Sequence, residues 1–483
     1  MKTFASSLYQ SPQFKIIQNI AKKKKIKIYL VGGFLRDCLL KRECFDYDFA
    51  VSRGALDVAK TFARKIKGAF VLLDHERGCG RVAKKQGERL WTFDFADFRE
   101  KTLRKDLAHR DFTINTLCVD LEELDQKSDM TDILFDYEHG LKDLKQKTIR
   151  MVSARSFQDD PLRMIRAFSH RALLDFKIEA KTLRQIKKDK SSIKEVSFER
   201  IRDEFFKILS SPRAAQTLKE MDRVGLLEQF IPQIYVMYRV KQGGYHHLDV
   251  WAHSLEAVRQ LEKLIPEIKN NQDIMGYIQE PLVTGRSRLS LMKLAVLLHD
   301  IGKPDARKRR GQRTYFYGHE RIGRNIARPI AQRLKLSTKE CYALEDMILW
   351  HLRPGYLSNF KQPSQRAIFR FLRDAKDEAV SILLLSWADQ RATRGPLTSS
   401  YDQKHHEKIV KQLIQLYFDK KKEKPLIRLI NGHDLIRKLK LKPSPLFAKI
   451  LSEVEERQAM GKIKTKREAL DCARKIAQKA GPS

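Results

Sequence analysis

The stretch YLVGGFLRDCLLKRECFDYDFAVS (residues 29–52) predicts a strand, a glycine turn, a short helix and a second strand. The apolar run that ends at Val31 suits a buried strand, and Gly32 and Gly33 end it. Glycines let backbone N–H groups approach a ligand that a Cβ would hold away. The N-terminus of the helix that follows is a favourable place for phosphate, and Arg36 follows it closely in the sequence.

Two aspartates lie on the second strand of this stretch. Asp46 and Asp48 are two residues apart, so on a strand their side chains share a face. Neighbouring carboxylates repel each other strongly unless a cation lies between them. Next to phosphate-binding glycines, the pair predicts a divalent-metal site for phosphoryl transfer. The alternative is an ordinary pair of surface aspartates at a strand end.

Three further strands are predicted near residues 69–73, 82–83 and 90–95. Asp94 therefore lies on a strand that we expect to neighbour the strand of the aspartate pair. This makes Asp94 a candidate third carboxylate, and Asp97 is the competing candidate.

Composition limits the class of protein and its partners. The chain has 483 residues, enough for two to four domains, and a formal net charge of +36. A charge excess spread along the chain favours a polyanion such as nucleic acid. No apolar run of about 18 residues predicts a membrane span. The six cysteines have no paired spacing and no signal peptide is predicted, so we expect a cytoplasmic protein.

Several segments resemble motifs of class II tRNA nucleotidyltransferases (CCA-adding enzymes) and bacterial poly(A) polymerases, which belong to the polymerase-β-like superfamily. These segments are GGFLRD (32–37), DYD (46–48), DLAHRDFTIN (106–115), DDPLRMIRA (159–167) and SFERIRDE (197–204). The resemblance implies an α+β fold, in which a nucleotidyltransferase head with a mixed sheet and helices precedes all-α neck, HD and tail domains. The implied domains are the head (1–145), a helical neck that recognises the base and binds RNA (146–230), an HD domain (231–395) and a helical C-terminal region that supports RNA (396–483).

The neck motif contains a carboxylate and guanidinium groups at helical spacing. Asp160, Arg163 and Arg166 are three residues apart, which predicts one helical face. A carboxylate beside a guanidinium offers acceptors and rigid donors that can recognise a base edge. The resemblance implies that Asp160 and Arg163 select the incoming base without a nucleic-acid template. It also implies that triphosphate or ribose is held by Arg166, Arg110, Arg36 and Gly33. The alternative is a salt-bridged surface helix.

Two positions depart from the family pattern. Ser169-His170 stands where an Arg-Phe pair is usual, and His109 replaces the first arginine of the usual Arg-Arg-Asp. Neither change removes a catalytic carboxylate, but both leave the nucleotide specificity open.

A second pattern of ligand-type side chains begins after about residue 230. Its order resembles the ligand set of an HD metal-dependent phosphohydrolase: His253, His299, Asp300, His319, His351 and Asp389. Histidine and aspartate suit divalent metals of borderline hardness. The alternative is an HD fold kept as an RNA-binding scaffold. The basic run 307–310 either brings phosphate to this site or is a solvated loop.

The leading hypothesis is a template-independent nucleotidyltransferase that adds CCA, or part of it, to the 3′ end of tRNA. ATP and CTP are the expected substrates, pyrophosphate is released, and an HD phosphohydrolase activity is expected in addition. Two Mg²⁺ ions are expected at Asp46, Asp48 and Asp94. The alternatives are a poly(A) polymerase acting on RNA 3′ ends and a protein whose main activity is HD-domain phosphohydrolysis.

Overall fold

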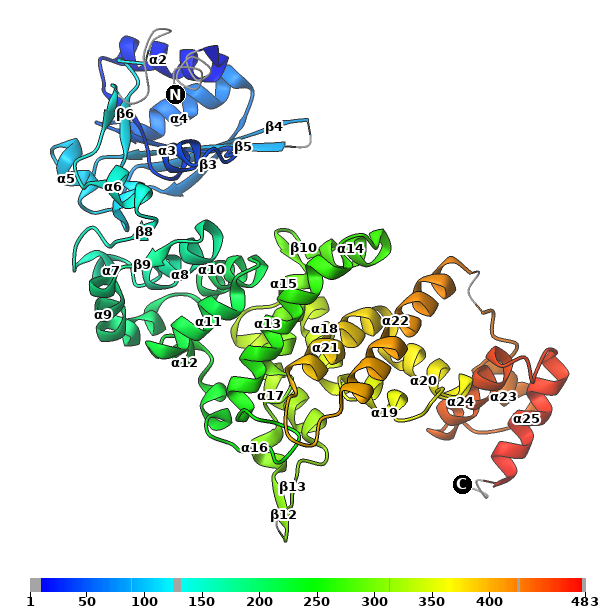
Figure 1. Ribbon diagram of the computed structural model, residues 1–483. Coiled ribbons are helices and arrows are strands. Elements are labelled where there is room, and N and C mark those ends of the chain that lie inside the picture. The colour runs from blue at the N-terminus through cyan, green and yellow to red at the C-terminus, as the bar shows by residue number, and fades with distance from the viewer. Residues whose placement is uncertain (1–9, 88, 125–131, 312, 424–425, 480–483) are drawn as a thin grey trace. The chain divides into compact units, whose positions relative to one another are not determined.

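The computed structural model describes residues 10–87, 89–124, 132–311, 313–423 and 426–479 (Figure 1). The chain forms two compact units. Unit 1 comprises residues 1–208 and 220–230, and unit 2 comprises residues 209–219 and 231–483.

Unit 1 contains a seven-stranded mixed sheet with the strand order β3-β4-β5-β2-β1-β6-β7. The central pair β2–β5 is parallel, and the other neighbouring pairs are antiparallel. The strands are β1 (Ile28–Val31), β2 (Asp46–Val51), β3 (Ala69–Asp74), β4 (Cys79–Gln86), β5 (Arg89–Asp97), β6 (Cys118–Asp120) and β7 (Leu134–Phe135). The strands predicted around the glycine turn and near residues 69–73, 82–83 and 90–95 are confirmed.

One face of the central strands is apolar and is covered by helix α4 (Ala55–Ile66). Phe62 of α4 packs edge-on against Phe93 and Phe95, with ring centroids 5.0 and 5.6 Å apart. Phe93 in turn stacks on Tyr47 of β2 at 5.0 Å. Since side chains alternate along a strand, the intervening residues Asp46, Asp48 and Asp94 point to the opposite face.

The other elements of unit 1 are mostly short helices. They are α2 (Pro12–Lys24), α3 (Gly33–Leu39), α5 (Leu103–Leu107), α6 (Gly140–Lys145), α7 (Ser156–Asp159), α8 (Arg163–Leu174), α9 (Ala180–Asp189), α10 (Phe198–Ser210) and α12 (Leu227–Phe230), with the strand pair β8 (Thr148–Ile149) and β9 (Lys177–Ile178). Helix α11 (Ala214–Arg223) contributes residues to both units.

The single helical face predicted for Asp160, Arg163 and Arg166 is wrong in one respect. Asp160 has an extended backbone (φ −155°, ψ 101°) and follows the end of α7, whereas α8 begins at Arg163. The reason is Pro161, whose ring disfavours a helical conformation of the residue before it. Asp160 therefore lies on a bend between two helices.

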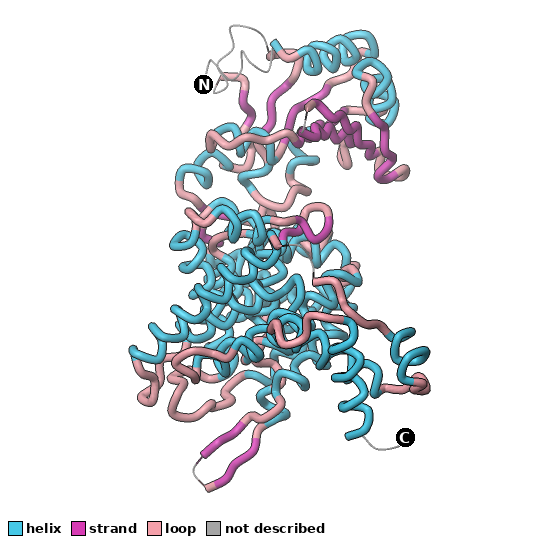
Figure 2. The backbone as a smooth tube through the Cα atoms, turned by 90° about the vertical axis from the view of Figure 1, so that its right-hand side faces the viewer, coloured by secondary structure: helices cyan, strands magenta, loops and turns pink. Residues whose placement is uncertain are grey.

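Unit 2 is mainly helical, and the β-hairpin formed by β12 (Lys308–Arg310) and β13 (Arg313–Tyr315) projects from it (Figures 1 and 2). Helices α15 and α21 are almost completely buried and form its core. The helices are α13 (Val250–Ile268), α14 (Gln272–Gln279), α15 (Arg288–Leu298), α16 (Lys303–Ala306), α17 (His319–Arg333), α18 (Thr338–Trp350), α19 (Arg353–Ser358), α20 (Gln365–Ala375), α21 (Ala379–Ala392) and α22 (Ser400–Lys422), with the strand pair β10 (Pro281–Val283) and β11 (Arg286–Ser287).

The C-terminal part of unit 2 has its own small apolar core, which includes Leu435, Ile450 and Ala469. Its helices are α23 (Gly432–Leu439), α24 (Leu446–Ala459) and α25 (Lys466–Lys479). The α+β fold expected from the sequence, a mixed-sheet head followed by helical parts, is confirmed. In the described part of the chain, no helix has both the length and the apolar character needed to cross a membrane.

Candidate functional site

The three candidate carboxylates of unit 1 lie side by side on the open face of the sheet. In the parallel β2–β5 register, Asp48 is opposite Asp94 and Asp46 is opposite Thr92. The Thr92 hydroxyl donates a hydrogen bond to Asp46. Asp97, the competing candidate, instead accepts a hydrogen bond from the backbone N–H of Ala55 at the start of α4, at 2.8 Å. The geometry therefore favours Asp94.

Arg81, which sequence reasoning missed, forms an ion pair with the carboxylate of Asp94. Arg81 of β4 is opposite Asp94 in the antiparallel register, and its Nε and Nη2 donate to the two carboxylate oxygens, each at 2.7 Å. Only the pairing of β4 with β5 brings these residues together, so no local motif signals the contact.

The charge state of Asp48 shows how crowded this face is. Burial, together with the neighbouring Asp46 and Asp94, raises the pKa of Asp48 to about 6, although Arg110 opposes the shift. A divalent cation would relieve this repulsion and keep the carboxylates ionised. The residues present therefore fit a metal site.

The glycine turn approaches Asp48 closely. Gly32 has a positive φ of 85°, and a Cβ there would lie 2.8 Å from Arg110 Nη1 and 3.0 Å from Asp48 Oδ2. A Cβ on Gly33 would meet Arg36 only at an ordinary contact distance of 3.5 Å. Gly32 is therefore the glycine whose lack of a Cβ this arrangement requires, and the nucleotide contact that the resemblance implies for Gly33 stays a prediction.

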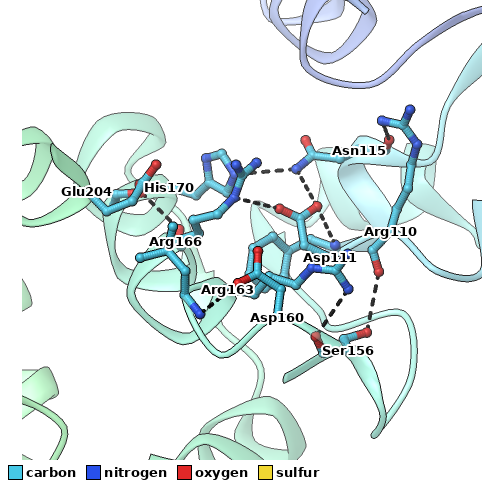
Figure 3. Close-up of polar contacts among 12 residues, drawn as sticks. Arg110, Asp111, Asn115, Ser156, Asp160, Arg163, Arg166, His170 and Glu204 are labelled. Carbon is cyan, nitrogen blue, oxygen red and sulfur yellow. Dashed lines mark hydrogen bonds and ion pairs between the residues drawn. The ribbon is translucent and has the colours of Figure 1, made fainter. Parts of the chain in front are cut away.

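A hydrogen-bonded network connects helix α3 with helix α8 through Asn115 and Asp111 (Figure 3). Arg36 donates to Asn115 Oδ1 at 2.7 Å, and Asn115 Nδ2 donates to Asp111 Oδ1 at 2.9 Å. Arg166 Nε donates to the other carboxylate oxygen of Asp111 at 2.9 Å. Burial opposes ionisation of Asp111, but Arg166 and the other polar neighbours, among them the hydrogen bond from Asn115, together hold the pKa of Asp111 below its ordinary value. Sequence reasoning missed Asp111 and Asn115 as members of the site, although both lie in the quoted DLAHRDFTIN segment.

The two departures from the family pattern are part of the same region. His170 Nε2 lies 3.3 Å from Asn115 Nδ2, and burial lowers the pKa of His170 well below its ordinary value. Ser169 donates to Glu204 at 2.7 Å. The Ser169-His170 pair therefore supports the network as neutral side chains. His109 lies 3.4 Å from Asp159 and 3.3 Å from Glu100.

Arg36 and Arg110 differ in how far they are already engaged. Besides Asn115, Arg36 contacts both carboxylate oxygens of Asp37, at 3.0 and 2.8 Å, and it is buried. Arg110 Nε is also buried but has no hydrogen-bond partner among the described residues. Arg110 is therefore the arginine that is better prepared to receive an anion.

Two adjoining cavities contain the predicted base-recognising residues. One of about 260 Å³ is lined by Ala50 and Ala96, which follow Asp48 and Asp94 on the same face of β2 and β5. Asp160 and Arg163 line this cavity and also a larger one of about 920 Å³. The three carboxylates line neither cavity but lie next to the first one along the strands.

The base-recognising residues have partners of their own in this structure. Asp160 Oδ2 accepts a hydrogen bond from Arg200 at 2.8 Å. Arg163 is buried and donates to two backbone carbonyl oxygens, of Ser156 at 3.1 Å and of His109 at 2.7 Å (Figure 3). These bonds fix the orientation of the Arg163 guanidinium.

In unit 2 the structure brings all six predicted HD residues together. Their potential ligand atoms form two groups in which the atoms lie within 4.8 Å of one another: His253, His299 and Asp389, and Asp300, His319 and His351. Asp300 joins the groups, because its Oδ2 lies 3.2 Å from His299 Nε2 and its Oδ1 lies 3.3 Å from His319 Nε2.

Three of these histidines have the same tautomer-fixing contact. The Nδ1 atoms of His299, His319 and His351 each lie 2.7 Å from the backbone carbonyl oxygen three residues earlier. Nδ1 therefore carries a proton, which leaves Nε2 as the ring nitrogen that can bind a metal once it is deprotonated. His299 Nε2 is buried and faces the carboxylates of Asp300 and Asp389, at 3.2 and 3.7 Å. This donor set fits a divalent metal.

Family models match most of the chain. They describe a poly(A) polymerase head domain (residues 28–150), an RNA- and SrmB-binding site of polymerase A (175–237), an HD domain (250–394) and tRNA nucleotidyltransferase domain 2 (397–473). The head and the HD domain both imply the use of divalent metal ions.

Individual proteins are similar along nearly the whole chain. The A-adding tRNA nucleotidyltransferase of Deinococcus radiodurans is 30% identical, over 91% of this chain and 93% of that protein. The CC-adding tRNA nucleotidyltransferase of Synechocystis is 28% identical, over 93% of each chain. A solved structure of a CCA-adding enzyme with ATP has the same fold, with a TM-score of 0.64 and 22% identity, over 98% of this chain and 96% of that chain. The chain therefore belongs to the family of class II tRNA nucleotidyltransferases and bacterial poly(A) polymerases, and it carries an HD domain.

Proposed function

We propose that this chain transfers nucleotides from NTPs to the 3′ end of tRNA without a template. The observation that carries the proposal is the position of Asp46, Asp48 and Asp94 on one sheet face, next to a cavity lined by Asp160 and Arg163. Reacting groups and base-recognising groups are thereby adjacent, as nucleotide addition requires.

Each group of the site has a separate task in this reaction. Mg²⁺ ions held by Asp46, Asp48 and Asp94 would activate the RNA 3′-hydroxyl and neutralise charge on the triphosphate. Arg110 and Arg166 supply fixed positive charge beside the carboxylates. Ala50 and Ala96 leave room over the strands for the nucleotide, because their side chains are small.

Asp160 offers hydrogen-bond acceptors to the base edge, and Arg163 offers donors. These side chains take the place of the complementary groups that a template would supply. The bend at Pro161 separates the Asp160 carboxylate from helix α8. Arg163 is held in place by its hydrogen bonds to two backbone carbonyl oxygens. Of three relatives that match more than 90% of the chain, one is named an A-adding and two are named CC-adding tRNA nucleotidyltransferases. We therefore propose addition of CCA or of one of its parts.

Three RNAs test this proposal: tRNA without its 3′ CCA, tRNA ending in CC, and an unrelated RNA. Each receives ATP and CTP singly and together, and the products are sized on a sequencing gel. Extension confined to the two tRNAs supports the proposal, and the tRNA that is extended identifies the part added. Long A tails on all three RNAs would instead identify a poly(A) polymerase. Asp48→Asn serves as the chemical control and must abolish extension.

We also propose a metal-dependent phosphohydrolase activity in the HD domain. The specific observation is that four histidines and two aspartates converge, and that a backbone carbonyl oxygen accepts from Nδ1 of His299, His319 and His351. Release of inorganic phosphate from nucleotide phosphate esters, measured with Mg²⁺, Mn²⁺, Co²⁺ and Ni²⁺ in turn, tests the activity and identifies the metal. The absence of metal-dependent release from wild type with every metal would contradict it.

The cytoplasm is the compartment that we propose for both activities. The six cysteines of the chain are free thiols in the structure, which suits a reducing environment.

A further inference from the structure

A basic cavity lies beside the HD ligand set in unit 2. It has a volume of about 560 Å³, and its walls are formed by segment 239–249 and by the β12–β13 hairpin. Four of the lining residues are cationic: Arg239, Lys241, Arg307 and Arg309. A cavity of this size is within the range of sites for small molecules.

The cationic side chains of the cavity outnumber its one carboxylate and are not paired with it. In the described ranges of the chain, none of the four cationic side chains makes an ion pair. The acidic lining residue, Asp249, is already engaged, because its two oxygens accept hydrogen bonds from the backbone N–H groups of Ala252 (2.8 Å) and Arg239 (3.1 Å).

Other arginines of unit 2 behave differently. Arg286 binds Glu340 through two nitrogens, at 2.7 and 3.0 Å, and Arg328 binds Glu345 in the same bidentate way, at 2.7 Å twice. Four unpaired cations around one cavity repel each other, and an anion from outside the protein would remove that repulsion.

The cavity wall touches the HD ligand set at two points. The His246 ring, which lines the cavity, packs edge-on against the ring of the ligand His253, with centroids 4.7 Å apart. Gln242, a second lining residue, accepts a hydrogen bond from Lys303 Nζ at 2.6 Å, and the same ammonium lies 2.6 Å from Asp300 Oδ2. His246 and the Gln242–Lys303 pair therefore connect the wall of the cavity directly to two of the metal ligands.

We propose that this cavity is a phosphate-binding subsite that holds the phosphate group of a nucleotide ester at the HD site. The proposal rests on the proposed HD phosphohydrolase function and assigns the binding of its substrate to Arg307 and Arg309, with Arg239 and Lys241. Guanidinium groups suit phosphate because they form paired, charge-assisted hydrogen bonds with its oxygens.

The hairpin provides a matched control within one short segment. Arg307 and Arg309 line the cavity, whereas Lys308 and Arg310 do not, since side chains alternate along a strand. The double variants Arg307→Gln/Arg309→Gln and Lys308→Gln/Arg310→Gln thus remove the same charge from the same hairpin on opposite faces.

Binding to the full-length protein is measured by calorimetry in EDTA, so that no metal takes part. The probes are adenosine 3′-monophosphate and a short oligoribonucleotide ending in a 3′-phosphate, with adenosine and the dephosphorylated oligonucleotide as blanks. The Arg307→Gln/Arg309→Gln variant is expected to bind at least one probe tenfold or more weakly, and the Lys308→Gln/Arg310→Gln variant within twofold of wild type. The probe that responds shows whether the phosphate comes from a free nucleotide or from an RNA end.

Equal losses in the two variants would show a general effect of hairpin charge and would overturn the subsite, as would unchanged binding of both probes in the Arg307→Gln/Arg309→Gln variant. Nucleotide addition to tRNA, which takes place in unit 1, is expected to be unchanged in both variants and confirms that they are folded. If the subsite binds phosphate but wild type releases none with any metal, the HD hydrolysis fails and the subsite stands.

Discussion

Arg81 and Asp94 form a bidentate ion pair on neighbouring strands, with both N–O distances at 2.7 Å. Asp94 is the third carboxylate of the acidic cluster with Asp46 and Asp48, and both of its oxygens are bound by Arg81. Arg81 therefore provides the positive charge that a metal ion would otherwise provide at Asp94. Metal binding at Asp94 and the ion pair compete for the same two oxygens.

This competition predicts the effect of removing Arg81. The Arg81→Gln variant is expected to bind Mn²⁺, used as a spectroscopic substitute for Mg²⁺, more tightly than wild type, because Asp94 loses its competing cation. The change is expected to be up to several-fold, since a partly exposed ion pair is worth about 0.2 to 1 kcal/mol. Electron paramagnetic resonance of free Mn²⁺ measures it directly. Lys85→Gln, which removes an exposed charge from the same strand, is the control. Weaker Mn²⁺ binding in Arg81→Gln would instead make Arg81 a residue that positions Asp94.

The two glycines of the turn are expected to respond differently to alanine. Gly32→Ala introduces a Cβ 2.8 Å from Arg110 Nη1 at a φ of 85° and a ψ of −139°, a backbone conformation whose strain alone costs about 1 to 3 kcal/mol. Nucleotide addition should fall at least tenfold because Arg110 must move. Gly33→Ala, with an ordinary contact of 3.5 Å, is expected to retain most activity. Steady-state rates with tRNA and thermal unfolding of both variants check this. A loss of activity in Gly33→Ala as large as in Gly32→Ala would contradict the assignment.

The parts of the site that the sequence predicted are those that one strand or one short motif determines. Asp46 and Asp48 share a face because side chains alternate along a strand with a period of two. Asp94 could be predicted as their neighbour because its strand was recognisable in the sequence. Arg81 was missed because strand pairing, rather than a motif, places it against Asp94. The helical face proposed for Asp160 failed because the spacing of three ignored the effect of Pro161 on the preceding residue.

In the HD site, too, the sequence predicted the residues but not the packing that brings them together. The ligand residues were predicted from their order in a resembling pattern. Their convergence depends on the packing of α13, α15, α17, α18 and α21, which periodicity does not determine. The basic run 307–310 was left open between phosphate binding and solvated loop, because the sequence does not show which side chains line a cavity.

Substitutions of the two base-recognising residues, Asp160 and Arg163, are expected to have different effects on stability. Asp160→Ala should alter the preference among NTPs with little effect on stability. Arg200, the ion-pair partner of Asp160, is exposed, so water can solvate it when Asp160 is removed. Arg163→Ala should alter the preference and also destabilise the protein by about 1 to 3 kcal/mol, since two backbone carbonyl oxygens lose their donor. NTP competition assays and denaturant unfolding separate the two effects. An unchanged NTP preference in both variants would contradict the base-recognition role, whatever happens to stability.

The protonation of the HD cluster predicts how metal binding depends on pH. Burial opposes protonation of His299, but Asp300 and Asp389 outweigh it and raise its pKa to about 10 in the absence of metal. At pH 8 a metal ion must therefore displace a proton from His299, and binding is expected to release about one proton from this residue and to weaken as the pH falls. Calorimetric titrations in two buffers of different ionisation enthalpy measure the protons released.

The same pKa fixes the sign of a second observable, the stability of the metal-free protein. His299 binds a proton more tightly in the folded chain than in the unfolded chain, where its pKa is about 6.5. The stabilisation from that proton is complete below the unfolded pKa and is lost as the pH rises through about 10. Thermal unfolding in EDTA should therefore show the contribution of His299 decreasing from about pH 7 to pH 10, and His299→Gln should show a flatter profile over this interval. Identical pH profiles for wild type and His299→Gln would show that the buried proton lies elsewhere in the cluster.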